Sequence, residues 1–584
     1  MKNLDELLLT VQKPGRYVGG EWNSVKKEWT EDKLKVLLAF PDAYEIGMSY
    51  LGMKVLYGML NGRDDCLCER VFSPWMDFEK VLRENSIALF SLESRKPISQ
   101  FDVIGFSLTY ELGYTNVLNM LDLGGIPKRS SDRRSEDPLI IAGGPACYNP
   151  EPMADFIDAF LIGDAEEAIL EIVDVCKGRG KGDVARIKLL RSLAGIKGVY
   201  VPSLYKIEYN QDNTIKQFSP TDEAIPKIIE KRFVKSLDSA FYPVNQVVPN
   251  IQVVHDRLVL EIMRGCKHAC RFCQATTTYR PCRERTKGEI LKLAKESYEA
   301  TGYDEISLLS LSTGDHSQVT QIIKELNEVF SRKCVSVSVP SLRVEDALKG
   351  LPALVSEVRK AGLTFAPEAG SACLRKIINK NIEIEKLSES VGESFRLGWR
   401  RIKLYFMIGL PSERDEDIFD IAAMAVHISD LKKKVDGRPA QLRVSINAFI
   451  PKPHTPFQWE AMDGIDELER KRALLRDAMK SRFIELDFHS FQMSYLEAVL
   501  SRGDRRLSDV IYEAWNAGAR FDGWGDLFNL KTWLSAFEKA SVDPSFYVGR
   551  KRGLSEILPW DFITVGLSRQ FFEKEAGVLE KPLI

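Results

Sequence analysis

Residues 261–277, EIMRGCKHACRFCQATT, decide how the fold of this chain is interpreted. They place three of its 10 cysteines, Cys266, Cys270 and Cys273, at C-x3-C-x2-C spacing. The apolar run 258–263 leads into the first cysteine and predicts a strand. Three thiolates therefore converge on one loop at a strand end. Such soft ligands suit zinc or an iron-sulfur cluster, and a cubane bound by only three cysteines leaves one iron open for a cofactor.

A closed zinc site is the alternative for the same loop. It needs a fourth ligand, for which His268 inside the motif or Cys282 beyond it is available. The two paired C-x2-C arms that zinc sites favour are missing, so the iron-sulfur cluster is the favoured interpretation. The other cysteines are predicted to be ordinary thiols. Cys66, Cys68 and Cys147 are candidates for a second metal site, but the C-x-C spacing of the first two disfavours it.

The chain after this loop alternates strand and helix patterns. Apolar runs that end in turn residues predict five further strands, at 305–311, 335–339, 363–366, 402–408 and 442–450. With the strand before the cysteines they make six β/α units, which predicts a partial (β/α)6 barrel related to the TIM barrel. In such barrels the functional loops follow the strands.

An earlier stretch of the chain has the same alternation. Short apolar runs at 36–40, 103–106, 139–142 and 159–162 predict a parallel sheet covered by helices, which is a Rossmann-like arrangement. The charged, glycine-containing KGRGKG at 177–182 favours a boundary. The expected fold class is α/β. Its expected parts are an N-terminal segment 1–32, a Rossmann-like domain 33–178, a connector 179–250, the barrel 251–490 and a helical C-terminal extension 491–584.

The charge of the chain is close to balanced. Lys and Arg number 81 against 83 Asp and Glu, which gives a formal net charge of -2. The chain therefore has no overall positive charge of the kind that indicates a nucleic-acid partner, and its net charge gives no support for an RNA partner. The start MKNLDELLLTVQKPG fits neither a signal peptide nor a membrane span. We therefore expect a cytoplasmic protein without a membrane segment.

The cysteine loop and the loops after the later strands resemble the radical S-adenosylmethionine (radical SAM) superfamily over residues of about 251–490. The matching loops are LLSLSTGDHS, VPSLRVED, LTFAPEAGS and YFMIGLPSE. The resemblance implies that Cys266, Cys270 and Cys273 hold a 4Fe-4S cluster whose open iron binds SAM. The implied SAM-facing residues are Phe272 near the adenine, Thr313, Gly314 and Asp315 at the amine, Ser341 and Arg343 at the ribose and carboxylate, Glu368 and Ser371 on a further loop, and Gly409, Leu410 and Pro411 near the adenine.

The N-terminal region resembles cobalamin-binding domains of the Rossmann type, which carry D-x-H-x-x-G, then S-x-T or S-x-L, then G-G. This chain has DAYEIG at 42–47, SLT at 107–109 and GG at 143–144, followed by IGDAEEAILEI at 162–172. Tyr44 stands where those domains have the cobalt-ligating histidine, so any cobalamin is expected without histidine ligation. The alternative is that the glycines only form tight turns. The implied cobalamin contacts are Asp42, Tyr44, Gly47, Ser107, Thr109, Gly143 and Gly144.

From end to end the chain resembles a family of largely uncharacterised bacterial proteins that fuse a cobalamin-binding-like domain to a radical SAM barrel. FPDAYEIGMSYLG, FIPKPHTPFQW and RGDRRLSDVIYEAW carry this match. It implies an enzyme that cleaves SAM to a 5′-deoxyadenosyl radical, with a reductase such as flavodoxin or ferredoxin as partner. The first hypothesis is cobalamin-dependent C-methyl transfer. The alternatives are a cobalamin-independent radical enzyme whose N-terminal domain binds substrate or a partner, and a non-enzymatic metal-binding scaffold for RNA or protein.

Overall fold

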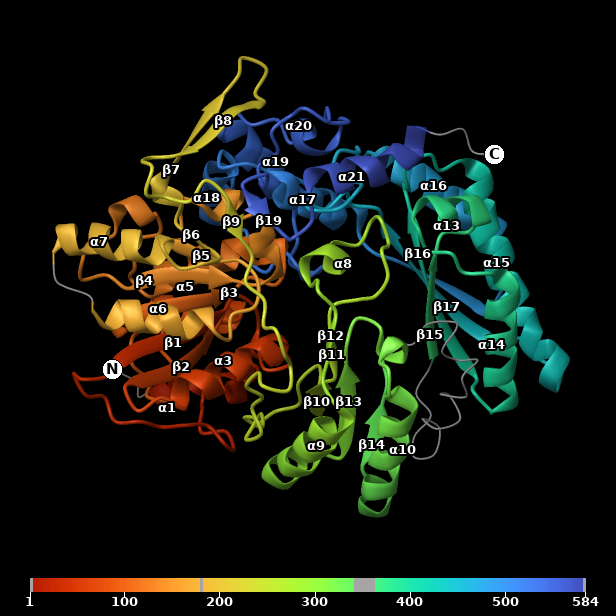
Figure 1. Cartoon of the computed structure of the whole chain (residues 1–584), viewed down its shortest axis with the longest axis horizontal. Coiled ribbons are helices and arrows are strands. Elements are labelled where there is room, and N and C mark those ends of the chain that lie inside the picture. The colour runs from red at the N-terminus through yellow and green to blue at the C-terminus, as the bar shows by residue number, and fades with distance from the viewer. Residues whose placement is uncertain (1–3, 179–181, 341–362, 581–584) are drawn as a thin grey trace.

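The computed structural model describes residues 4–178, 182–340 and 363–580. Its α/β fold agrees with the expected class, with one sheet in the N-terminal part and two sheets in the region expected to form a barrel. Figure 1 shows the N-terminal sheet beside the barrel sheets, with the C-terminal helices lying across both. Among the described residues, no helix is long and apolar enough to cross a membrane.

The N-terminal sheet has the strand order β2-β1-β3-β4-β5-β6, and all neighbours are parallel except β5 and β6. From β1 the next strand, β2, is added on one side, and β3 and the following strands are added on the other. Doubly wound sheets bind ligands at this switch point, beyond the carboxyl ends of the strands. The strands are β1 Leu34–Phe40, β2 Cys66–Phe72, β3 Val103–Ser107, β4 Leu139–Gly143, β5 Ala159–Leu161 and β6 Val199–Tyr200. The helices are α2 Tyr44–Gly47, α3 Leu51–Asn61, α4 Met76–Glu84, α5 Tyr114–Leu123, α6 Ala168–Lys177 and α7 Asp183–Ala194.

The sequence analysis missed two strands of this sheet, which are β6, inside the predicted connector, and the fully buried strand β2. All its residues are buried, including Glu69 and Arg70, which a buried strand normally excludes. Arg70 is accommodated by two buried carboxylates: its Nη2 lies 2.9 Å from Glu21 Oε2, and its Nε lies 2.6 Å from Glu93 Oε1. These partners are far away in sequence, so no local pattern reveals that Arg70 is neutralised.

The barrel region consists of two parallel sheets, ordered β10-β13-β14 and β15-β16-β17-β18. The six predicted strands are present, and β18 is an additional one. The strands are β10 Leu258–Glu261, β13 Glu305–Leu309, β14 Ser336–Ser338, β15 Leu363–Glu368, β16 Arg401–Ile408, β17 Gln441–Ala448 and β18 Ile484–Phe488. The helices are α9 Lys287–Thr301, α10 Val319–Phe330, α13 Ala372–Ile377, α14 Ile384–Arg396, α15 Asp415–Asp436 and α16 Ile465–Ala478.

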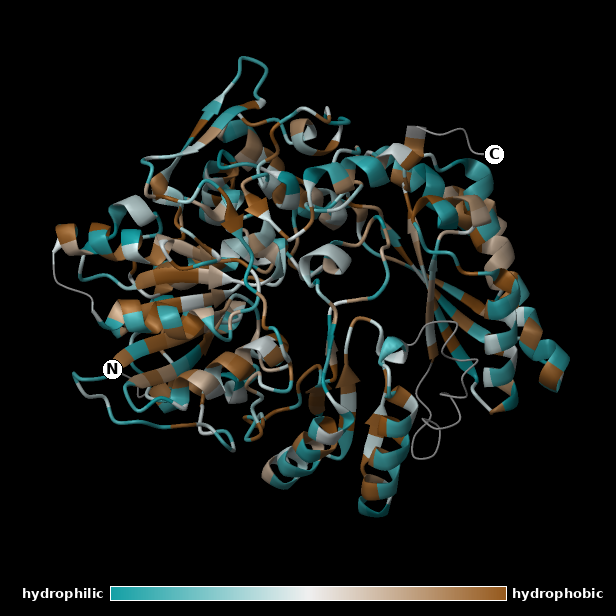
Figure 2. Ribbon diagram, in the orientation of Figure 1, coloured by the Kyte–Doolittle hydropathy of each residue, from teal (hydrophilic) through white to brown (hydrophobic). Residues whose placement is uncertain are grey.

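The barrel strands bury one face against the outer helices. In β16, Leu404 and Phe406 belong to the apolar core, whereas Lys403 and Tyr405 on the other face are partly exposed. Figure 2 shows the apolar residues concentrated on the strands of the N-terminal sheet and on β10 and β13. This alternation leaves a polar inner face beneath the loops that follow the strands.

The connector and the C-terminal extension tie the two parts together. The connector forms a hairpin of β7 Tyr205–Tyr209 and β8 Ile215–Pro220, and its strand β9 Ile229–Glu230 pairs with β19 Ile563–Thr564 near the end of the chain. Helix α18 packs on α5 of the N-terminal part, and α17 packs beside β17 of the barrel. The C-terminal helices are α17 Phe491–Arg502, α18 Leu507–Asn516, α19 Leu530–Lys539, α20 Ser545–Val548 and α21 Arg569–Ala576.

Candidate cofactor site

The three cysteines lie on the loop between β11 Met263–Arg264 and the short helix α8 Gln274–Thr278. Figure 1 places α8 between the N-terminal sheet and the barrel sheets. Cys266 and Cys270 are buried, and Cys273 is partly exposed. Burial raises the pKa of the Cys273 thiol to about 11, and the neighbouring Cys270 and Cys266 thiols add to the rise. The three soft donors are thus shielded from water and near one another, which fits an iron-sulfur cluster. Across the described ranges, no three His, Cys, Asp or Glu side chains converge on a position for a single metal ion.

The cysteine loop is fixed to the barrel by hydrogen bonds around Arg271. The backbone N–H of Arg271 donates to the Ile378 carbonyl at 3.0 Å, and its Nη1 donates to the Ile377 carbonyl at 2.7 Å. Its Nε lies 2.9 Å from Glu575 Oε2 of α21. The loop is therefore held between the end of α13 and the C-terminal extension, which makes its shape depend on distant parts of the chain.

Asp315, predicted to receive the SAM amine, ends the short 3-10 helix Thr313–Asp315 that follows β13. Its Oδ2 lies 2.7 Å from His268 Nε2 inside the cysteine motif. Its backbone carbonyl accepts from Lys267 Nζ at 2.7 Å. Thr313 and Gly314 are buried. The structure therefore brings the Thr-Gly-Asp loop against the cysteine loop.

The loop after β15 holds two further predicted SAM residues. Glu368 has a positive φ of 69° and forms an ion pair of 2.8 Å with Lys380. The Ser371 side chain accepts from the Leu374 N–H at the start of α13, so it caps this helix. Both side chains are already engaged within the chain. Ser341 and Arg343 lie outside the described residues.

Of the predicted adenine-side residues, Phe272 and Leu410 share one apolar cluster. Phe272 packs against buried residues that include Leu410 and Phe449, which follow β16 and β17. Gly409 has φ of +82°, and a side chain there would press on Leu468 and Asp463, which explains the glycine. Pro411 is partly exposed beside them. The structure therefore joins the cysteine loop and the β16 loop through apolar contacts that can exclude water.

The residues expected to contact cobalamin at the end of β1 are engaged by the chain itself. Asp42 Oδ1 accepts from Trp524 Nε1 at 2.8 Å. Tyr44 is buried, and its hydroxyl lies 3.1 Å from Glu21 Oε1, in the network around Arg70. A side chain at Gly47 would overlap the Phe72 ring. The Tyr44 side chain therefore faces the interior of the N-terminal part.

The remaining expected cobalamin residues follow β3 and β4. Ser107 is buried and Thr109 is partly exposed. Gly144 has φ of +118°, and a Cβ there would lie 2.5 Å from the Leu108 carbonyl oxygen, so the glycine is required by a close backbone approach. Gly143 pairs with Leu161 inside the sheet. The glycines therefore allow close backbone approaches at the ends of β3 and β4.

Two buried residues near the cysteine loop were not identified from the sequence. Lys231 Nζ donates to the Thr278 and Arg280 carbonyls at 2.8 and 2.5 Å, which caps the end of α8. His454 Nε2 lies 2.9 Å from the Tyr148 carbonyl oxygen, and the His454 carbonyl accepts from Thr277 at 2.7 Å. The signal for His454 was its place in PKPHTPF at 451–457, whereas Lys231 has no local signal.

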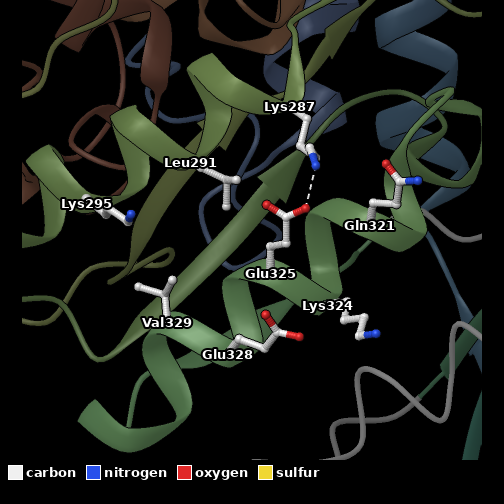
Figure 3. Close-up of a pocket in the computed structure, with 8 residues that line it drawn as sticks. All are labelled: Lys287, Leu291, Lys295, Gln321, Lys324, Glu325, Glu328 and Val329. Atoms are coloured by element: carbon white, nitrogen blue, oxygen red, sulfur yellow. Dashed lines mark hydrogen bonds and ion pairs between the residues drawn. The ribbon is translucent and has the colours of Figure 1, made fainter.

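A groove of about 520 Å³ lies elsewhere, between α9 and α10. Figure 3 shows Lys287 and Leu291 of α9 facing Glu325 and Val329 of α10, with an ion pair between Lys287 and Glu325. None of the predicted site residues lines the groove. It therefore belongs to the packing of the two outer helices.

Comparison with protein families places two matches on the chain. Residues 260–425 match the Radical SAM superfamily, and residues 52–202 match a family described as Radical SAM proteins, N-terminal. The first match includes the cysteine loop, the Thr-Gly-Asp loop and the loop after β16. The second covers most of the N-terminal sheet.

Two curated relatives are similar to this chain. An uncharacterised protein of Methanocaldococcus jannaschii, MJ0966, is 27% identical over 82% of this chain and 90% of its own length. That relative is archaeal, whereas the resemblance drawn from the sequence was to bacterial proteins. The ribosomal protein uS12 methylthiotransferase RimO of a Thermoanaerobacter species is 22% identical over 51% of this chain and 70% of its own length.

Solved structures with a related arrangement include two radical SAM proteins. The methyltransferase TsrM from Kitasatospora setae, with cobalamin and a [4Fe-4S] cluster bound, is 14% identical, covers 71% of this chain and 75% of its own, and has a TM-score of 0.48. The cobalamin-dependent enzyme OxsB with aqua-cobalamin is 12% identical, covers 87% and 71%, and has a TM-score of 0.46.

Proposed function

Since residues 260–425 form a domain of the Radical SAM superfamily, we propose that this protein is an enzyme that cleaves SAM reductively at a 4Fe-4S cluster held by Cys266, Cys270 and Cys273. When bound, the cluster supplies one electron to the SAM sulfonium, which breaks the S–C5′ bond into methionine and a 5′-deoxyadenosyl radical that takes a hydrogen atom from the substrate. The electron comes from an external reductase of the flavodoxin or ferredoxin class.

The observation that carries this proposal is the meeting of the cysteine loop with the Thr-Gly-Asp loop. His268 and Lys267, both inside the cysteine motif, contact Asp315 at 2.7 Å. A carboxylate at this position is suited to orient the ammonium group of SAM beside the cluster cysteines. Phe272 and Leu410 supply an apolar surface for the adenine and keep water away from it.

Cobalamin-dependent C-methyl transfer is the second candidate, and the strand order of the N-terminal sheet favours it. The parallel order β2-β1-β3-β4-β5 places a switch point between β1 and β3, where such sheets bind cofactors. Tyr44 is hydrogen-bonded to Glu21 in the interior, so a corrinoid at this switch point would bind without ligation by this residue. We assign no step to a corrinoid, and the alternative is a cobalamin-independent radical enzyme whose N-terminal domain binds substrate or a partner.

Anaerobic purification separates these candidates. The chain is reconstituted with iron, sulfide and hydroxocobalamin, and each component is quantified per chain. We expect about four iron and four sulfide per chain. A cluster without stoichiometric corrinoid would favour the cobalamin-independent alternative. Near-equimolar corrinoid that survives gel filtration would instead support the methyl-transfer candidate. Absence of an iron-sulfur cluster would contradict the proposed function and favour a metal-binding scaffold.

A further inference from the structure

The GDAEE segment at 163–167, which follows β5, contacts the barrel next to the cysteine loop. Arg264 Nη2 lies 2.7 Å from Glu166 Oε1, and Arg264 Nη1 lies 3.2 Å from Asp164 Oδ1. Arg283 Nη1 lies 2.7 Å from the second carboxylate oxygen of Asp164. The side chains of Asp164 and Glu166 are each only 9% exposed. Two carboxylates of the N-terminal part therefore bind two arginines of the barrel in a largely buried network.

Both arginines sit on the strand pair that carries the cysteines. Arg264 and Arg283 face one another in the antiparallel pair of β11 and β12 Arg283–Glu284. Gly265, with φ of +91°, follows Arg264, and Cys266 follows directly. The network is thus two residues from the first cluster cysteine. A shift of Arg264 would move the start of the cysteine loop.

Each carboxylate of this network is paired with an arginine. Burial alone would raise the pKa of Asp164, but Arg264 and Arg283 outweigh burial and hold it below its ordinary value. Arg264 also forms a two-point contact with Glu261 at 2.8 and 2.9 Å. Since charge-assisted, two-point arginine contacts fix geometry more strongly than single contacts, the arginine head has little freedom to rotate.

The N-terminal part also contacts the other end of the cysteine segment. Tyr148, which follows β4, donates its hydroxyl to the Thr278 carbonyl at the end of α8. Gly163 has φ of +105°, and a Cβ there would lie 2.1 Å from the Arg232 carbonyl oxygen, so the GDAEE segment is pressed against the connector. The cysteine segment is therefore held at both of its ends by loops that follow strands β4 and β5.

We propose that Asp164 and Glu166 are positioning residues for the cluster: their ion pairs to Arg264 and Arg283 fix the β11–β12 pair and thereby set the geometry of the cysteine loop. This inference rests on the proposed function. In this account the acidic residues of the GDAEE segment bind arginines of the barrel and hold no ligand of their own. The N-terminal part then acts as a structural support for the radical chemistry.

The test compares Glu166→Gln with Glu167→Gln in the full-length chain. Glutamine keeps the shape of the side chain but removes its charge, and Glu167 is a matched control because it pairs with Arg232 at a site 60% exposed. In the apo-protein, Glu166→Gln should increase the rate of amide hydrogen exchange about tenfold over residues 262–285. This factor corresponds to the loss of one charge-assisted hydrogen bond. The exchange rate over residues 303–311 should not change.

The reconstituted variants give a second readout. Glu166→Gln should keep its iron and sulfide content but change the electron paramagnetic resonance spectrum of the reduced cluster, and lower kcat for 5′-deoxyadenosine about tenfold with KM for SAM unchanged. Exchange and spectra equal to those of Glu167→Gln would overturn the inference, as would a uniform increase in exchange along the whole chain. A wild-type protein without a cluster would instead contradict the proposed function.

Discussion

His268 Nε2 lies 2.7 Å from Asp315 Oδ2, so a side chain inside the cysteine motif is bonded to the carboxylate that follows β13. This contact joins two loops that belong to different strands of the barrel. It predicts that binding of SAM and the shape of the cysteine loop are coupled through Asp315.

Replacement of Asp315 by Asn tests this coupling. Because a neutral amide cannot balance the positive charge of the SAM ammonium group, we expect the affinity for SAM to fall by about 10- to 100-fold. This is the effect expected from the loss of one charge-assisted contact. The iron content should stay that of the wild type. Isothermal titration with SAM under anaerobic conditions measures the change. Glu305→Gln is the control, since Glu305 pairs with Arg257 at the other end of β13; equal affinity in both variants would contradict the assignment.

Replacement of Cys270 by Ala should abolish cluster assembly, because a cubane bound by two cysteines loses a ligand that no other residue of the motif replaces. The matched control is Cys334→Ser, since Cys334 is exposed and lies outside the motif. Absorbance near 400 nm and iron analysis after reconstitution measure the difference. A Cys270→Ala protein that retains a full cluster would show that the ligand set is wrong.

The sequence predicted most of the barrel and the cysteine loop, because these features are local. Apolar runs mark the strands, and the cysteine spacing is contained within eight residues, 266–273. Strand β2 was missed because Arg70 is neutralised by Glu21 and Glu93, whose positions depend on the fold. The GDAEE motif was recognised, but its contact with Arg264 joins residues about a hundred positions apart, which no local sequence pattern reveals.

Replacement of Arg70 by Met tests the buried network of the N-terminal sheet. The change leaves two buried carboxylates without a cation, so we expect a loss of about 3–5 kcal/mol in the free energy of unfolding. Lys80→Met is the control, because the Lys80–Glu84 pair is exposed and should contribute less than about 1 kcal/mol. Urea denaturation of both apo-proteins measures the difference, and similar losses would contradict the account of β2.

The pH dependence of the free energy of unfolding should include a contribution from the buried His454 side chain. Burial lowers the pKa of His454 to about 4, and Lys231 adds to this effect, whereas the Tyr148 carbonyl opposes it. In the unfolded chain His454 binds a proton near pH 6.5, whereas in the folded chain it stays neutral down to about pH 4. The free energy of unfolding therefore falls as the pH drops from about 6.5 toward 4. A shift of this size corresponds to about 3 kcal/mol.

His454→Asn removes the titrating group and suits the positive φ of 55° at this position. The difference between its urea midpoints at pH 5 and pH 7 should be smaller than that of the wild type. An unchanged difference would show that other groups cause the acid sensitivity.

The most direct test of the central claim is the cleavage of SAM by the reconstituted chain. The protein is incubated anaerobically with SAM and dithionite, and 5′-deoxyadenosine and methionine are quantified by chromatography. We predict both products in equal amounts, at least one per cluster, and none with the Cys270→Ala variant. Intact SAM in the presence of a fully assembled, reduced 4Fe-4S cluster would contradict the assignment of this protein as a radical SAM enzyme.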